Sequence, residues 1–128
     1  MPNILVIDDD KLVAEATQGL LGAQGYDVTV AYNGKSGIEA ARSDRFDLAI
    51  VDLFMPDMNG LQVIKVIRES NPDIPMIAVS GFMFGKACPE MPGFESMAAE
   101  VGAVSTLYKP FQPNHLLEAI ETAIGAAA

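Results

Sequence analysis

The chain has 128 residues, a formal net charge of −9 at pH 7 and a hydrophobic fraction of 50%. This length and composition are typical of one globular domain with its own core, and they exclude a disordered chain. The negative charge argues against a nucleic-acid-binding protein, because contacts with phosphates need a basic surface. The apolar runs are too short to span a bilayer, and residues 1–3 lack the basic start of a signal peptide, so we expect a cytoplasmic protein.

Short apolar runs alternate with helical patterns along the whole chain. The apolar runs predict strands at 3–7, 26–30, 46–51, 76–79 and 104–108. The helical patterns predict helices at 11–24, 35–43, 60–70, 94–101 and 113–124. In the first of these helices, apolar side chains recur at four-residue spacing at Leu12, Ala16 and Leu20, with Val13 and Leu21 alongside. The alternation predicts an α/β fold in which βαβ units build a doubly wound parallel sheet with helices on both faces.

Acidic side chains follow two of the predicted strands, at the point where each strand ends. Asp8 and Asp9 come directly after the first strand, and Asp52 comes directly after the third. In an open α/β sheet, groups at the carboxyl ends of neighbouring strands converge on one crevice. Three carboxylates gathered there would repel one another at neutral pH, and this favours the binding of a hard divalent cation. The alternative is that these acids only cap the following helix, a role that we expect of Asp10.

Further polar residues follow the other strands of the predicted sheet. Ser80 follows the fourth strand, Lys109 follows the fifth and begins a Lys-Pro-Phe turn, and residues 52–60 form a loop that runs from aspartate through proline to glycine. Taken together and in this order, these residues resemble the receiver domain of two-component response regulators. The resemblance extends from the first strand to the last helix. It implies a flavodoxin-like five-stranded sheet with the strand order 2-1-3-4-5.

The resemblance implies that Asp52 is a phosphoacceptor. Its carboxylate would receive a phosphoryl group from a histidine of a sensor kinase, or of a histidine phosphotransfer protein, and form an aspartyl phosphate. Lys109 would place its positive charge on the phosphoryl oxygens, and Ser80 would donate a hydrogen bond to one of them. Such a domain signals and is not an enzyme that acts on other molecules.

The resemblance also implies that the cation is Mg²⁺. Asp9 and Asp52 would be direct ligands, Asp8 would act nearby or through a water molecule, and the backbone carbonyl of Phe54 would supply another oxygen. Mg²⁺ usually keeps several waters and uses few carboxylates. This habit suits a site that must also admit a phosphoryl oxygen.

The resemblance further implies how a signal would leave the domain. Residues 1–128 would form a single receiver domain with no effector domain, and output would pass through contacts with a downstream protein that the sequence does not name. The last helix and its neighbouring strand would be the face for a homodimer. We expect no contact with nucleic acid or with a membrane.

The chain departs from the family at three places. Many receivers carry an aromatic switch residue three positions before the lysine, where this chain has Thr106, so another element must report phosphorylation. Residues 81–93 form a longer loop rich in glycine and proline, which either orders when Ser80 engages the phosphoryl group or packs passively on the core. Phe54 and Phe82 flank the site where many relatives carry polar residues. Because apolar side chains cannot hydrogen-bond an attacking water, we predict slow self-dephosphorylation.

Two other functions stay open on the sequence. A pseudo-receiver would bind its partners without being phosphorylated. A phosphatase of the haloacid-dehalogenase type would use Asp8 as the nucleophile and Asp10 as the general acid, although Leu12 stands where that family usually has threonine or valine. The carboxylate that becomes phosphorylated, Asp52 or Asp8, distinguishes the receiver from the phosphatase.

Overall fold

The computed structural model describes most of the chain. The described residues are 2–53, 55, 59–80, 82–83, 86–87, 105–108 and 112–127. Only the backbone is described at 80, 82–83, 86–87, 105–108 and 126–127. The helix predicted at 94–101 and the site residues Phe54 and Lys109 lie outside the described residues.

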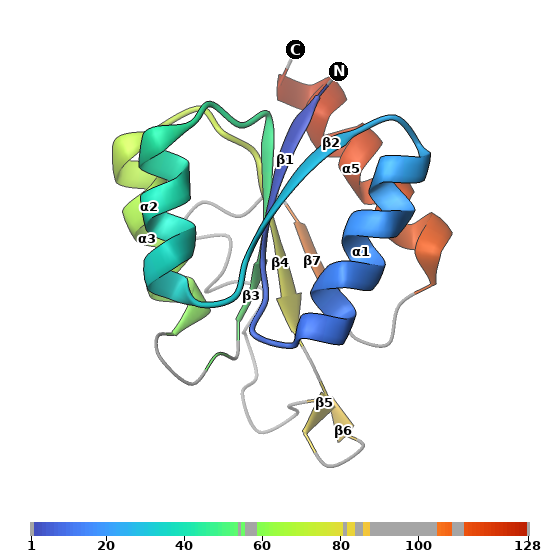
Figure 1. Ribbon diagram of the computed structural model, residues 1–128. Coiled ribbons are helices and arrows are strands. Elements are labelled where there is room, and N and C mark those ends of the chain that lie inside the picture. The colour runs from blue at the N-terminus through green and yellow to red at the C-terminus, as the bar shows by residue number, and fades with distance from the viewer. Residues whose placement is uncertain are drawn as a thin grey trace.

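The main sheet has five parallel strands in the order β2-β1-β3-β4-β7 (Figure 1). These strands are β1 (Asn3–Ile7), β2 (Asp27–Ala31), β3 (Leu48–Asp52), β4 (Met76–Ser80) and β7 (Ser105–Tyr108). Since β7 is the fifth strand of the predicted pattern, the flavodoxin-like order 2-1-3-4-5 is confirmed. All five strands point the same way, so their carboxyl ends meet at one edge of the sheet.

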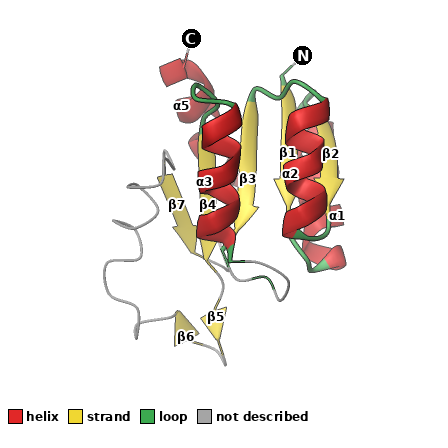
Figure 2. Ribbon diagram, turned by 90° about the vertical axis from the view of Figure 1, so that its left-hand side faces the viewer, coloured by secondary structure: helices red, strands yellow, loops and turns green. Residues whose placement is uncertain are grey.

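Helices cover both faces of this sheet, as the sequence predicts. They are α1 (Lys11–Ala23), α2 (Gly34–Ser43), α3 (Gly60–Ser70) and α5 (Pro113–Ala127). The helices α1 and α5 lie on one face, and α2 and α3 lie side by side on the other (Figures 1 and 2). None of the helices in the described ranges is long and apolar enough to cross a membrane.

The stretch 81–93, which we expected to be irregular, contains a short antiparallel hairpin. It is formed by β5 (Phe82–Met83) and β6 (Lys86–Ala87), which pair with each other and not with the main sheet. Figure 1 places this hairpin beyond the carboxyl end of β4. The other residues of the stretch lie outside the described ones, so the choice between an ordering loop and a passive loop stays untested.

Alternate side chains of the strands build two apolar cores, one on each face of the sheet. Leu5 and Ile7 of β1 are fully buried in the core beneath α2 and α3. Ile4 and Val6 point to the core beneath α1 and α5. A large aliphatic side chain contributes about 1.5–3 kcal/mol when it is fully buried. Burial on both faces fixes the register of β1, because a slip of one residue would exchange the two sets.

The face of α1 that is buried is not the face that carries the four-residue apolar spacing. The four-residue spacing of Leu12, Ala16 and Leu20 predicted the helix, but Leu12 is 80% exposed and Ala16 is also exposed. The residues that are buried are Ala14 and Leu21, which lie two turns apart. Leu20 is half-buried at the edge of the same face.

Polar side chains cap the first turn of three helices. The side chains of Asp10, Asn33 and Asn59 each accept hydrogen bonds from backbone N–H groups at the starts of α1, α2 and α3. The expected capping role of Asp10 is therefore confirmed. Gly25, which lies just past the C-terminus of α1, has a φ of 92°, a conformation that favours glycine.

Candidate functional site

The carboxyl ends of β1 and β3 carry two buried carboxylates. Ile7 and Val51 are paired in register, so the residues that follow them, Asp8 and Asp52, lie next to each other. Both acids are only 5% exposed. The backbone N–H of Asp8 donates to the carbonyl of Ala31 at 3.0 Å, which extends the pairing with β2 to the acid itself. The main chain that carries Asp8 is therefore held by the sheet on the β2 side.

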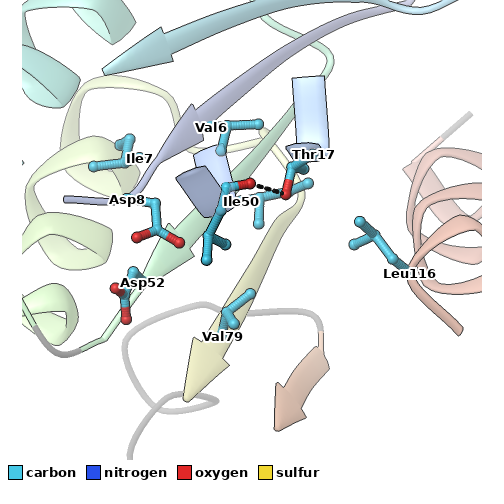
Figure 3. A pocket seen from close by; sticks show the side chains of 9 residues that line it. Val6, Ile7, Asp8, Thr17, Ile50, Asp52, Val79 and Leu116 are labelled. Atoms are coloured by element: carbon cyan, nitrogen blue, oxygen red, sulfur yellow. Dashed lines mark hydrogen bonds between the residues drawn. The ribbon is translucent and has the colours of Figure 1, made fainter. Parts of the chain in front are cut away.

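Asp9 completes a group of three carboxylates. Each of Asp8, Asp9 and Asp52 offers one oxygen that lies within 4.8 Å of the other two. Figure 3 shows the side chains of Asp8 and Asp52 beside each other. Asp9 is exposed, so the group of three carboxylates is open to solvent on the side where Asp9 lies. The convergence that the sequence predicts for these three residues is found in the structure.

The turn between β1 and α1 ties the acid group to the helix. The N–H of Asp10 donates to Oδ1 of Asp8 at 2.9 Å, which holds one oxygen of the buried carboxylate. The carboxylate of Asp10 accepts from the N–H groups of Leu12 and Val13 at 3.0 and 3.3 Å. The side chain of Asp10 is thus engaged by the helix start, and it is not part of the group of three.

The start of α3 lies directly against the backbone of Asp52. A Cβ atom placed on Gly60 would collide with the carbonyl oxygen of Asp52 and with Cα of Leu53. The N–H of Gly60 donates to the carbonyl of Leu53 at 3.1 Å, and the Asn59 side chain accepts from the N–H of Leu61 at 2.8 Å. Glycine is required here by the close approach of two backbones.

A second glycine brings α2 close to the end of β1. A Cβ atom on Gly37 would lie 2.7 Å from Cγ1 and 3.0 Å from Cγ2 of Ile7, the residue before Asp8. Contacts of this length force a neighbour to shift. The two helices on this face therefore each pack through a glycine against a strand that carries one of the buried acids.

A small cavity lies behind the two buried acids. It is bounded by Asp8 and Asp52 at one end and by side chains of α1 and α5, among them Thr17 and Leu116 (Figure 3). Its volume is about 10 Å³, which is room for one water molecule at most. The hydroxyl of Thr17 donates to the carbonyl of Val13 at 2.8 Å. A reactant must therefore approach the carboxylates from the open edge of the sheet and not through this cavity.

A cation–π pair, which sequence analysis missed, joins the start of α1 to the residue after β2. Nζ of Lys11 is 5.7 Å from the centre of the Tyr32 ring. Lys11 begins α1, and Tyr32 follows the last residue of β2. The unusual feature in the sequence is a lysine in the first helical turn, where the helix dipole disfavours a positive charge.

The donor set of the group suits a hard divalent cation. Asp8, Asp9 and Asp52 offer carboxylate oxygens only, which are the ligands that Mg²⁺ and Ca²⁺ prefer. Two of the three are buried, where repulsion between like charges is screened less than in water. A cation between them would relieve that repulsion. The residues present therefore fit Mg²⁺.

Of the other residues that the sequence singles out, the structure describes Ser80, Phe82 and Thr106 by their backbone alone. The backbone of Ser80 ends β4, the strand next to β3. The side chains of Ser80, Thr106 and Phe82 lie outside the described part of the chain, as do Phe54 and Lys109 as a whole. Their roles stay predictions.

The sequence matches a family of known proteins over most of its length. Residues 4–121 match the model of the response regulator receiver domain. The transcriptional regulatory protein ZraR of Salmonella typhimurium is 34% identical over 122 residues, which are 95% of this chain and 26% of the relative. The transcriptional regulatory protein DltR of Streptococcus agalactiae is 32% identical over 117 residues, which are 91% of this chain and 49% of the relative. The chain thus spans about a quarter to a half of the length of these relatives.

Solved structures of small receivers share the fold. A response regulator receiver domain protein (CheY-like) from Methanospirillum hungatei superposes with a TM-score of 0.90 at 26% identity, covering 99% of this chain and 96% of the other. The chemotaxis protein CheY4 of Vibrio cholerae superposes with a TM-score of 0.85 at 27% identity, covering 96% and 98%. With the family match, the sheet order and the three converging acids, the chain belongs to the response regulator receiver domain family.

Proposed function

We propose that this receiver domain is a phosphoacceptor of a two-component system and that Asp52 is the residue that becomes phosphorylated. The observation that carries the proposal is the convergence of Asp8, Asp9 and Asp52 within 4.8 Å at the open edge of the sheet. The phosphoryl donor would be a phosphohistidine on a sensor kinase or on a histidine phosphotransfer protein. Output would pass through protein contacts, which the net charge of −9 favours over contacts with nucleic acid.

The transfer itself needs one nucleophile and one leaving group. A carboxylate oxygen of Asp52 attacks the phosphorus, and an O–P bond forms while the N–P bond to the donor histidine breaks. The electron pair of the broken bond stays on the imidazole nitrogen. We assign the attack to Asp52 and not to Asp8 because Asp52 ends β3 and begins the loop from aspartate through proline to glycine that carries the resemblance to receiver domains.

The carboxylates of Asp8, Asp9 and Asp52 would hold a Mg²⁺ ion, with the backbone carbonyl of Phe54 as a further ligand. Such an ion neutralises negative charge between an attacking carboxylate and a phosphoryl group. The exposed position of Asp9 supports this assignment, because it leaves the open side of the group accessible to solvent and to the donor.

Two further residues would contact the phosphoryl group. We assign a hydrogen bond from the hydroxyl of Ser80 and a point charge from Lys109 to its oxygens. The support is positional, since Ser80 ends β4 and Lys109 follows β7, whose last residue Tyr108 is in register with Ser80. Both strand ends therefore open onto the edge that carries Asp52.

The observed hydrogen bonds weigh against the phosphatase alternative. That mechanism needs Asp10 as a general acid beside a nucleophilic Asp8, but the carboxylate of Asp10 accepts the N–H groups of Leu12 and Val13. An acid engaged in a helix cap is not placed to protonate a leaving group. The pseudo-receiver alternative is distinguished only by experiment.

Intact-mass spectrometry after incubation with Mg²⁺ and acetyl phosphate tests the proposal. We expect one phosphoryl adduct on the wild type and none on Asp52→Asn. The matched control is Asp10→Asn, which removes one negative charge, keeps the helix cap and should keep the adduct. An adduct that persists in Asp52→Asn would support phosphorylation of Asp8 by a phosphatase-type mechanism. No adduct on the wild type, with acetyl phosphate or with a phosphorylated histidine kinase, would support the pseudo-receiver.

A further inference from the structure

The Lys11–Tyr32 pair joins two segments that lie far apart in the sequence. The Lys11 ammonium lies 5.7 Å from the ring centre, within the range of a cation–π contact. Lys11 is exposed and Tyr32 is 37% exposed. At such exposure the pair contributes little to folding stability, so its position is of more interest than its energy.

Each member of the pair is one residue away from a group that binds Asp8. Lys11 follows Asp10, whose N–H donates to Oδ1 of Asp8 at 2.9 Å. Tyr32 follows Ala31, whose carbonyl accepts the N–H of Asp8 at 3.0 Å. The cation–π contact therefore joins the two segments whose backbones hydrogen-bond Asp8.

The nearby acids offer the Lys11 ammonium a competing partner. Lys11 is two residues from Asp9, which is exposed and belongs to the group of three carboxylates. The first turn of α1 holds no acidic residue; the other acids near Lys11 in the sequence are the N-cap Asp10, whose carboxylate accepts two backbone N–H groups, and the exposed Glu15 one turn further on. Yet in the part of the chain that the structure describes, the one interaction of the Lys11 side chain is with the Tyr32 ring.

We propose that Tyr32 is a positioning residue that keeps the Lys11 ammonium away from Asp9, so that Asp9 stays available to a divalent cation. An ammonium paired with Asp9 would have to be displaced before a cation could bind there. Because an exposed ion pair and an exposed cation–π contact are of similar strength, removal of the ring shifts the ammonium toward the acid. The inference rests on the proposed Mg²⁺ site.

Isothermal titration calorimetry with Mg²⁺ on the unphosphorylated protein tests the inference without any measurement of phosphorylation. We expect Tyr32→Leu to weaken Mg²⁺ binding about two- to five-fold. The conservative variant Tyr32→Phe keeps a ring face for the ammonium and should bind within about two-fold of the wild type. The double variant Lys11→Met/Tyr32→Leu has no competing ammonium, so its affinity should return to the wild-type value or exceed it.

A second readout observes the pair itself. In the metal-free protein, the ring current of Tyr32 should shift the NMR signals of the Lys11 side-chain methylenes, and Tyr32→Leu should abolish that shift.

Equal Mg²⁺ affinity in the wild type and Tyr32→Leu would overturn the inference and leave the metal site intact. A loss that persists in the double variant would also overturn it, because Tyr32 would then act through packing. Absence of Mg²⁺ binding by the wild type would overturn the metal site and the inference together.

Discussion

Ile7 and Val51 are paired in register across β1 and β3, and this pairing brings Asp8 and Asp52 together at the carboxyl edge of the sheet. Both acids are buried, and Asp9 brings a third carboxylate oxygen within 4.8 Å. Like charges held this close repel one another. A divalent cation that binds them only in the folded state would relieve this repulsion and stabilise the fold.

Mg²⁺ should therefore stabilise the domain against unfolding. At a Mg²⁺ concentration about 100 times the dissociation constant, the free energy of unfolding should rise by about 2.7 kcal/mol. Asp8→Asn should lose most of this gain, since the amide removes one charge from the group. Urea titrations with and without Mg²⁺ measure the difference.

The control for this experiment is Asp44→Asn, which makes the same change of charge at an exposed residue after α2. Its stabilisation by Mg²⁺ should equal that of the wild type. If Asp8→Asn were stabilised as much as Asp44→Asn, the cation would act through general screening of the net charge and not at the three acids.

Gly60→Ala should destabilise the protein and slow its phosphorylation. The added methyl group would meet the backbone of Asp52 and Leu53, neither of which can move without disturbing β3. We expect a cost of about 1–3 kcal/mol in urea unfolding and a lower rate of adduct formation with acetyl phosphate. The rate falls because the carboxylate of Asp52 is displaced together with its backbone.

Gly19→Ala is the matched control for Gly60→Ala. Gly19 also lies in a helix, but a Cβ atom placed on it has no neighbour within 4 Å. This change should stabilise the domain by roughly 0.5–1 kcal/mol, because alanine favours the helix. Phosphorylation should be unchanged. Destabilisation by Gly19→Ala similar to that of Gly60→Ala would contradict the close approach as the cause.

The side chain of Asp10 should matter for stability and not for phosphorylation. Asp10→Ala removes the acceptor for the N–H groups of Leu12 and Val13 and should cost about 1 kcal/mol. Asp10→Asn keeps an acceptor and should be nearly neutral. Both variants should be phosphorylated at Asp52 by acetyl phosphate, as measured by peptide mass mapping. Loss of the adduct in a folded Asp10→Asn protein would instead indicate a role for Asp10 as an acid.

The sequence predicts the acid group well because its geometry follows from local rules. Asp8 and Asp52 each come directly after a buried run, and parallel strands meet at their carboxyl ends. The helix cap of Asp10 is equally local, since it depends on residue type and position before a helix. Such features need no knowledge of which distant residues pack together.

Features that depend on tertiary packing could not be predicted in the same way. The Lys11–Tyr32 contact joins α1 to the end of β2, and the Gly37–Ile7 contact joins α2 to β1. Neither contact leaves a local pattern in the sequence, because its two partners belong to different elements and lie far apart along the chain. The exposed position of Leu12 is a further case, since spacing along a helix does not tell which of two possible faces meets the sheet.

Leu12 and Leu21, two of the three leucines of α1, test which face of this helix carries the stability of the fold. Leu21 is fully buried, whereas Leu12 is 80% exposed. Leu21→Ala should cost about 2–5 kcal/mol in urea unfolding through lost burial and the cavity left behind. Leu12→Ala should change stability by less than about 0.5 kcal/mol. Both variants make the same chemical change in one helix, so helix propensity contributes similarly to each. Similar costs for the two variants would mean that Leu12, and with it the spacing of Leu12, Ala16 and Leu20, contacts the core after all.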